Sequence, residues 1–208
     1  MFKNAVRALA VVLVCGTASA AYAQSPGQPI PPAHFFDGPL LHVYSPDSEG
    51  WLVTGRSGIG IAFGKRGTAP NETFGAQAVM FELGPEVRGD ALVDFVRKRI
   101  ATMNPPPRFE ETTSAYRYHE ARGYPCVDVN VGFHDNAAVT PSGEQRLLLR
   151  VIALYCRHPV VSELGFFAAY SHRGPSGDAE IKEAAMRYIA GVTVNPRIAE
   201  QVKREPAR

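Results

Sequence analysis

Two stretches of sequence decide the fold: residues 124–134 (YPCVDVNVGFH) and residues 145–157 (QRLLLRVIALYCR). Both show the alternation and the β-branched residues that are typical of strands. Residues 135–144 between them (DNAAVTPSGE) are rich in turn formers. The sequence therefore predicts an antiparallel hairpin folded about Pro141.

This hairpin places Cys126 opposite Cys156. The same register predicts one wholly apolar face, on which the pairs are Val127 with Tyr155, Val129 with Ala153, Val131 with Val151, and Phe133 with Leu149. A slip of one residue would set Val131 against Arg150 and separate the two cysteines. Directly opposed residues in the narrow type of strand pair lie close enough for a disulfide.

Residues 1–23 have the features of an export signal. Lys3 and Arg7 supply a positive start, residues 8–15 are an apolar run, and residues 21–23 end in a small-x-small cleavage pattern. The apolar run is too short to span a bilayer, which takes ~20 apolar residues. We therefore expect the signal to be removed and the mature protein to be periplasmic or secreted.

Export changes how the cysteines are interpreted. Removal of the signal leaves two of the three cysteines, and an even count in an exported chain favours a Cys126–Cys156 disulfide. Closing this loop should stabilise the fold by ~3–4 kcal/mol. The alternatives are two reduced, buried cysteines and, less favoured within a strand, a catalytic thiol. Lipid attachment at Cys15 is disfavoured because Val14 precedes it, where that processing needs a small residue.

The charge balance excludes one class of partner. The chain carries 22 basic and 20 acidic residues, and both excess positive charges lie in the signal. The mature chain is thus formally neutral, without the basic stripe of a nucleic-acid binder. We expect no nucleic-acid partner and, after signal removal, no integral membrane segment.

Four regions follow along the chain: the signal (1–23), a flexible proline-rich tether (24–34), a single domain (35–194) and a polar tail (195–208). Helical spacing of apolar residues predicts helices at 90–103 and 178–190, the first capped by Asp90 and stopped by three prolines. Strands are predicted at 51–54, 58–64, 76–83, 110–119, 125–134, 145–157 and 161–172. We expect an α+β domain: a mainly antiparallel sheet of six to seven strands flanked by two helices.

This element order resembles that of the PsbP-like superfamily. The residues that carry the resemblance are an early aromatic in 48–53 (SEGWLV), a helix before a hairpin strand, and a closing helix followed by a valine segment at 192–194. The superfamily includes the extrinsic photosystem II subunit, a Ran-binding factor and small exported DcrB-like proteins. The resemblance, over residues 41–194, implies an α/β/α sandwich with an accessory or binding role. It carries over no functional residue.

Glycine-rich residues 54–67 do not match the motifs that they suggest. A phosphate-binding loop would need glycine in place of Ile59 and a hydroxyl residue in place of Arg66. Ile59 also breaks the nucleophile-elbow pattern around Ser57. We therefore expect Ser57 to be a turn serine.

The histidines offer no paired metal ligands, because none shows H-x-H or H-x-x-x-H spacing. His134 and Asp135 lie at a strand end, where they could bind a ligand or simply terminate the strand. His119 is a further candidate for acid–base chemistry. We expect no metal and no cofactor.

Polar and aromatic strand residues give the remaining candidates. Tyr116 and Tyr118 share one strand face and form either a ligand or partner surface or a core-facing pair. Asp128 and Asn130 mark either the edge of a cleft or a less buried face. The Arg97–Arg99 cluster favours a solvated helix face over contact with an anionic membrane surface.

The sequence thus favours a non-catalytic exported binding module for an unknown envelope protein or small ligand. This rests on the missing catalytic motifs, the neutral charge and the resemblance. Two alternatives stay open. One is a periplasmic hydrolase or metal-dependent enzyme with a site assembled from distant residues, among them Ser57, His119, His134 and Asp135. The other is a carrier of a hydrophobic ligand, which predicts a large apolar cavity between sheet and helix.

Overall fold

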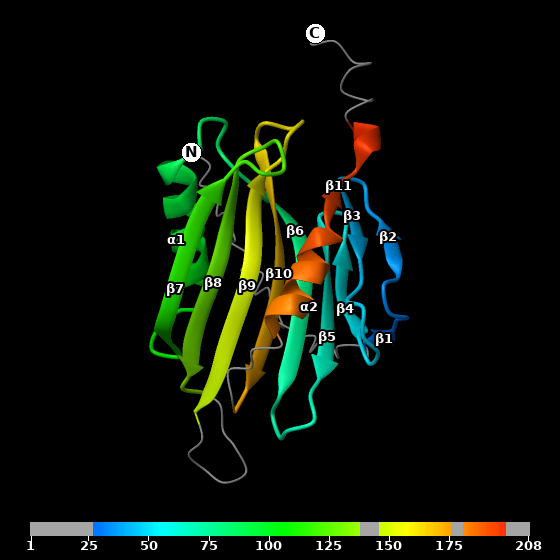
Figure 1. The fold of residues 1–208 in the computed structure, drawn as a ribbon, viewed down its shortest axis with the longest axis vertical. Helices are drawn as coiled ribbons and strands as arrows, with labels where there is room; N and C mark the ends of the chain where they lie inside the picture. Colours follow the sequence, from blue (N-terminus) through cyan, green and yellow to red (C-terminus); the bar gives the residue numbers. More distant parts are fainter. Residues whose placement is uncertain (1–26, 138–145, 176–180, 199–208) are drawn as a thin grey trace, which may run out of the picture.

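The computed structural model describes residues 27–137, 146–175 and 181–198. Its main sheet has eight antiparallel strands in the order β1-β4-β5-β6-β10-β9-β8-β7 (Figure 1). The strands are β1 (Gln28–Pro29), β4 (Leu52–Ser57), β5 (Gly60–Arg66), β6 (Thr73–Glu82), β7 (Phe109–His119), β8 (Cys126–Asp135), β9 (Leu147–Arg157) and β10 (Leu164–Gly174). A second sheet has the order β11-β3-β2, with β2 (Phe35–Asp37), β3 (Leu41–Tyr44) and β11 (Thr193–Val194).

The antiparallel α+β class is confirmed, but the expected layout of six to seven strands and two helices is not. The main sheet has eight strands and a second sheet adds three. Besides helices α1 (Asp90–Met103) and α2 (Ile181–Ala190), a helical turn covers residues 196–198. The extra strands are two to four residues long, too short for alternation to reveal them.

The predicted β8–β9 register is confirmed. Cys126 pairs with Cys156, Val129 with Ala153, and Phe133 with Leu149. The two sulfurs form a disulfide, and the cysteine α-carbons are 4.1 Å apart. The turn expected at 135–144 lies outside the described residues from residue 138 onward.

Helix α1 has the predicted bounds because its sequence defines both ends. Leu92, Val96 and Ile100 form its fully buried stripe, and each such burial stabilises the fold by ~1.5–3 kcal/mol. Prolines after Asn104 stop the helix. The expected N-cap was wrong by one position: Gly89 is the N-cap, without a side-chain hydrogen bond, and Asp90 begins the helix.

The two helices lie on opposite faces of the sheet. Helix α1 links β6 to the edge strand β7 and packs against β7 and β8. Helix α2 crosses the other face, in front of the sheet in Figure 1, and packs against β10 and β9. The small sheet shares the α2 face, where Leu41 and Val43 join its core. Each helix therefore covers only part of its face.

The ends of the predicted domain take part in the fold. Within the expected tether, Gln28 and Pro29 pair with β4 at the edge of the sheet, one of the few places in a sheet that tolerate proline. Within the expected tail, Asn195 is buried and its side-chain amide donates to the Gly38 carbonyl oxygen at 2.9 Å. The signal (1–23), the start of the second predicted helix (178–180) and residues 199–208 lie outside the described residues.

Candidate functional site

A groove of about 760 Å³ lies beside α2 on the face that α2 covers. Its floor is formed by β7, β8 and β9, and its wall by one side of α2. The residues that line it are Ala115, Tyr116, Arg117, Tyr118, His119, Ala121, Arg122, Asp128, Val129, Asn130, Ile152, Ala153, Leu154, Lys182, Met186 and Ile189. Its size is within the ~300–1,000 Å³ range of small-molecule sites.

The groove exists because α2 covers β10 and β9 but does not reach the edge of the sheet at β7. Strand alternation sends Val127, Val129 and Val131 beneath α1 on the opposite face. Asp128 and Asn130 consequently point into the groove. Of the two interpretations of these polar residues, the cleft edge is the one that the structure supports.

An ion-pair network crosses the groove floor. Arg117 Nη2 donates to Asp128 Oδ2 at 2.6 Å, and His119 Nε2 lies 3.2 Å from Asp128 Oδ1. Arg117 and Asp128 face each other across β7 and β8. The Asp128 side chain is 38% exposed and that of Arg117 is 79% exposed, so this network contributes little to stability. It fixes the orientation of three polar groups at the groove surface.

His119 has no free ring nitrogen. The backbone N–H of Ala121 donates to Nδ1 at 3.2 Å, so the proton of the neutral ring is on Nε2, which donates to Asp128. A general base needs a ring nitrogen that can accept a proton from a substrate. The described residues that line the groove also include no serine, threonine or cysteine. The described residues of the groove therefore do not place a hydroxyl or thiol nucleophile beside a free histidine nitrogen.

The helical wall presents one stripe to the groove, formed by Lys182, Met186 and Ile189. Ile189 is buried in the core, whereas Met186 is 54% exposed. Met186 is therefore the largest apolar contact that the wall offers to a ligand. Arg122, from the turn between β7 and β8, closes one end by donating to the carbonyl oxygens of Ile189 and Val192 at 2.9 and 2.8 Å.

Tyr116 and Tyr118 contribute to the other face of the sheet. Both are partly buried against the core beneath α1, and the guanidinium carbon of Arg97 lies 5.1 Å from the Tyr116 ring centre. Burial, reinforced by Glu111, raises the pKa of Tyr116. A hydrogen bond to the Glu120 carboxylate raises the pKa of Tyr118. Their part in the groove is limited to its edge along β7.

His134 and Asp135 lie at the opposite end of β8 from the groove. Asp135 is fully buried, and its carboxylate accepts hydrogen bonds from Arg108 at 3.2 and 3.3 Å. Arg173 Nε lies 3.0 Å from the same carboxylate. Burial acts to raise the pKa of Asp135, but the hydrogen bonds from Arg108 and from the Ala137 amide, with the Arg173 charge, bring it below its ordinary value. The doublet is thus separate from the tyrosines, and Asp135 is a structural anion.

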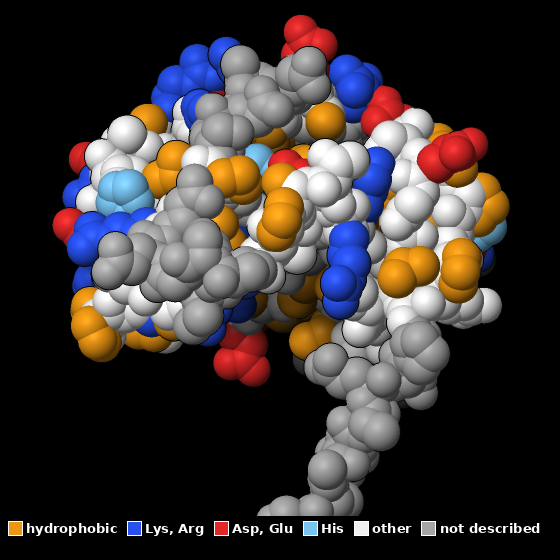
Figure 2. Space-filling view, turned by 90° about the horizontal axis from the view of Figure 1, so that it is seen from below, with side chains coloured by type: hydrophobic (Ala, Val, Ile, Leu, Met, Phe, Trp, Pro, Cys, Tyr) orange, Lys and Arg blue, Asp and Glu red, His pale blue; other side chains and the backbone are white. Residues whose placement is uncertain are grey.

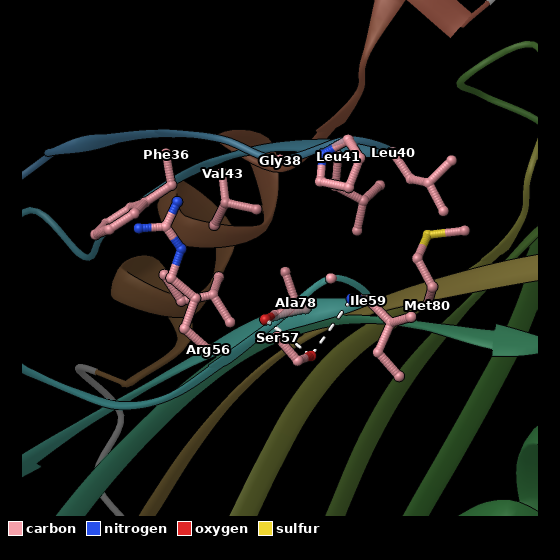
Figure 3. A pocket seen from close by; sticks show the side chains of 14 residues that line it. Phe36, Gly38, Leu40, Leu41, Val43, Arg56, Ser57, Ile59, Ala78 and Met80 are labelled. Atoms are coloured by element: carbon pink, nitrogen blue, oxygen red, sulfur yellow. Dashed lines mark hydrogen bonds between the residues drawn. The ribbon is translucent and has the colours of Figure 1, made fainter. Parts of the chain in front are cut away.

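Ser57 lines a different hollow, a narrow slot between the small sheet and the β4–β5 hairpin (Figure 3). Its hydroxyl accepts the Ile59 N–H at 3.3 Å and lies 3.5 Å from the Gly60 carbonyl oxygen. These are contacts within one tight turn, as expected for a turn serine. Ser57, His119 and His134 do not meet in one site.

Within the described residues, no group of three or more metal-ligating side chains could hold a metal ion. In the same ranges, no helix has the length and apolar character needed to cross a membrane. Lys and Arg side chains are interspersed with acidic and hydrophobic ones on the end of the molecule shown in Figure 2. Among the described residues of that end, neither sign of charge forms a broad field (Figure 2).

The groove could not be found from sequence motifs, because its residues come from β7, β8, β9 and α2 without a fixed spacing. The available signal was the pair Asp128 and Asn130, polar residues on an otherwise apolar ribbon. No protein-family model and no curated protein matches the sequence.

Proposed function

We propose that this protein is an exported, non-catalytic binding module that holds an envelope protein or a small ligand in the groove beside α2. The observation that carries the proposal is the groove itself: an open hollow with an apolar wall and a polar floor. Ligand sites in proteins combine these two features, apolar contact for affinity and a few fixed polar groups for orientation.

Export is part of the proposal, and two features support it. Residues 1–23 have the charge, apolar run and cleavage pattern of a signal. Cys126 and Cys156, paired in the structure, are fully buried. Disulfides persist mainly in oxidising compartments, so the bond fits a periplasmic or secreted protein.

Binding without catalysis is supported by how the polar groups are used. Asp128 is paired with Arg117 and His119, and both nitrogens of His119 have partners. A hydrolase would need a free base beside a nucleophile.

Membership of the PsbP-like superfamily also remains our proposal. The helices on opposite faces of an antiparallel sheet support it. The accessory role of many members of that superfamily agrees with the proposed binding role.

The experiment is affinity capture from the native cell envelope with three forms of the mature protein. The wild type should retain a specific partner, identified by mass spectrometry. Met186→Glu places a charge on the groove wall and should abolish retention. Met103→Glu is the matched control, because Met103 is a similarly exposed methionine (41%) on the other helix.

The pattern of the three captures decides the outcome. A partner kept by wild type and Met103→Glu but lost with Met186→Glu supports the groove. Equal retention by all three forms contradicts it. Turnover of an ester, phosphoester or peptide test substrate by the wild type, lost on His119→Gln, would replace the binding role with an enzymatic one.

A further inference from the structure

The slot between the small sheet and the β4–β5 hairpin is separate from the groove. Its floor includes Ala78 and Met80 of β6, and its roof includes Leu41 and Val43 of β3 (Figure 3). All four side chains are buried. The interior of the slot is therefore apolar, and it lies where two sheets meet without fully interlocking.

The size of the slot limits what can enter it. Its volume is about 40 Å³, whereas a single water needs ~10–15 Å³ on this scale. About three water-sized groups would fit, which corresponds to an alkyl tail of about three or four carbons. Empty cavities with apolar linings stay dry and accept small apolar molecules.

A cationic group stands at the rim of the slot. Arg56 is exposed and lines the slot, and its guanidinium carbon lies 5.5 Å from the Phe36 ring centre. Within residues 27–137, 146–175 and 181–198, no carboxylate forms an ion pair with Arg56. A guanidinium above an aromatic ring keeps N–H donors on its edge, and these match a carboxylate in two parallel hydrogen bonds.

We propose that the slot binds a short aliphatic carboxylate, with the alkyl tail between the sheets and the carboxylate on Arg56. Isovalerate has the required chemistry: a branched four-carbon tail and one negative charge. The slot admits only about three or four carbons, which a free short acid fills, and binding of a chain terminus is an outcome that the test separates. Ser57 remains within its turn and has no part in binding.

The test is a titration of the mature protein with isovalerate, followed by methyl NMR. Binding in the slot should shift the methyl signals of Val43, Ile59 and Met80 and leave those of Met186 in the groove unchanged. Isovaleramide has the same shape without the charge, so it should bind ~10-fold more weakly or worse, as expected for the loss of a charge-assisted hydrogen-bonded pair. N-acetylvaline represents a chain terminus and should bind more weakly than isovalerate.

Two variants and a control locate the interaction. Arg56→Gln should weaken isovalerate binding by ~10-fold or more. The start of β5 lines the slot, and Arg66 is the last residue of that strand. Arg66→Gln removes the same charge from this exposed position away from the slot and should leave the affinity for isovalerate unchanged. Ala78→Val fills the slot and should abolish binding, with the emission of the buried Trp51 used to confirm folding. If Ala78→Val does not fold, the comparison of Arg56→Gln with Arg66→Gln decides whether isovalerate binds in the slot.

Several results would overturn the proposal. They are equal affinity for acid and amide, tighter binding of N-acetylvaline, equal losses in Arg56→Gln and Arg66→Gln, or no shift at millimolar isovalerate. Met186→Glu should bind isovalerate normally. The experiments therefore distinguish a wrong proposal for the groove from a wrong proposal for the slot.

Discussion

Arg122 Nη2 donates a hydrogen bond to the carbonyl oxygen of Ile189 at 2.9 Å, across a separation of 67 residues. Its other terminal nitrogen donates to the Val192 carbonyl oxygen at 2.8 Å. The last carbonyls of a helix have no partner within the helix, and a cation is favourable at that end. A single side chain from the β7–β8 turn thus fixes both the end of α2 and the closed end of the groove.

Arg122→Met should therefore lower the free energy of unfolding by about 1–2 kcal/mol, since two hydrogen bonds from a charged group are lost. Trp51 is the single tryptophan and is 1% exposed, so its fluorescence reports unfolding in denaturant. Arg117→Met is the control. Arg117 makes an exposed ion pair, and its loss should cost less than about 1 kcal/mol. Equal losses for the two variants would remove the anchoring role of Arg122.

The disulfide should be the largest single covalent contribution to stability. Replacement of both Cys126 and Cys156 by alanine should reduce the free energy of unfolding by ~3–4 kcal/mol, mainly through the unfolded chain. A non-reducing mass measurement of the exported protein should find two fewer hydrogens than in the reduced form. Two free thiols in the native protein would show that the bond does not form in the cell.

The hairpin register and α1 could be predicted because their signals are local. Valines alternate with polar residues from Val127 to Val131, and a slip would have moved all of them to the wrong face. The helix has an apolar stripe and a proline stop within 20 residues of sequence. The secondary structure of a long element with a strict periodicity can therefore be predicted from the sequence of that element alone.

The small sheet and the groove could not be predicted, because both depend on contacts between distant segments. Strand β3 pairs with β11, which lies about 150 residues further along the chain, and each has only a few residues. The groove depends on how far α2 extends across the sheet, which no local pattern records. Tyr116 and Asp135, each a candidate for ligand or partner binding from the sequence, lie at different places along the β7–β8 ribbon.

Asp135 should hold the Arg108 end of the sheet together in a pH-dependent way. Its pKa in the folded protein is below 3.8 despite burial, so its contribution is present above the unfolded-state pKa and is lost as pH falls through the folded value. Asp135→Asn should lower stability by about 2 kcal/mol at pH 7. The difference from wild type should shrink below about pH 4. A difference that is constant from pH 7 to acid would exclude the ion pair as its cause.

His158 should give a second acid-sensitive contribution. Its side chain is 1% exposed, and burial lowers its pKa below 6.5, against a smaller opposing effect of the Leu40 carbonyl. The unfolded chain therefore binds a proton first, and stability should fall as pH drops below about 6.5. His158→Gln should flatten this slope, measured by denaturant unfolding at several pH values. His34→Gln, at an exposed position, should retain it, and an unchanged slope in both variants would assign the proton uptake elsewhere.

The most direct test of the binding role is site-specific photo-cross-linking in the native envelope. A photo-reactive residue in place of Met186 on the groove wall should give one discrete adduct, with a partner protein or a small molecule, identified by mass spectrometry. The same residue in place of Met103 should not give that adduct. No adduct from position 186, or the same adduct from both positions, would contradict the groove as the site through which this protein acts.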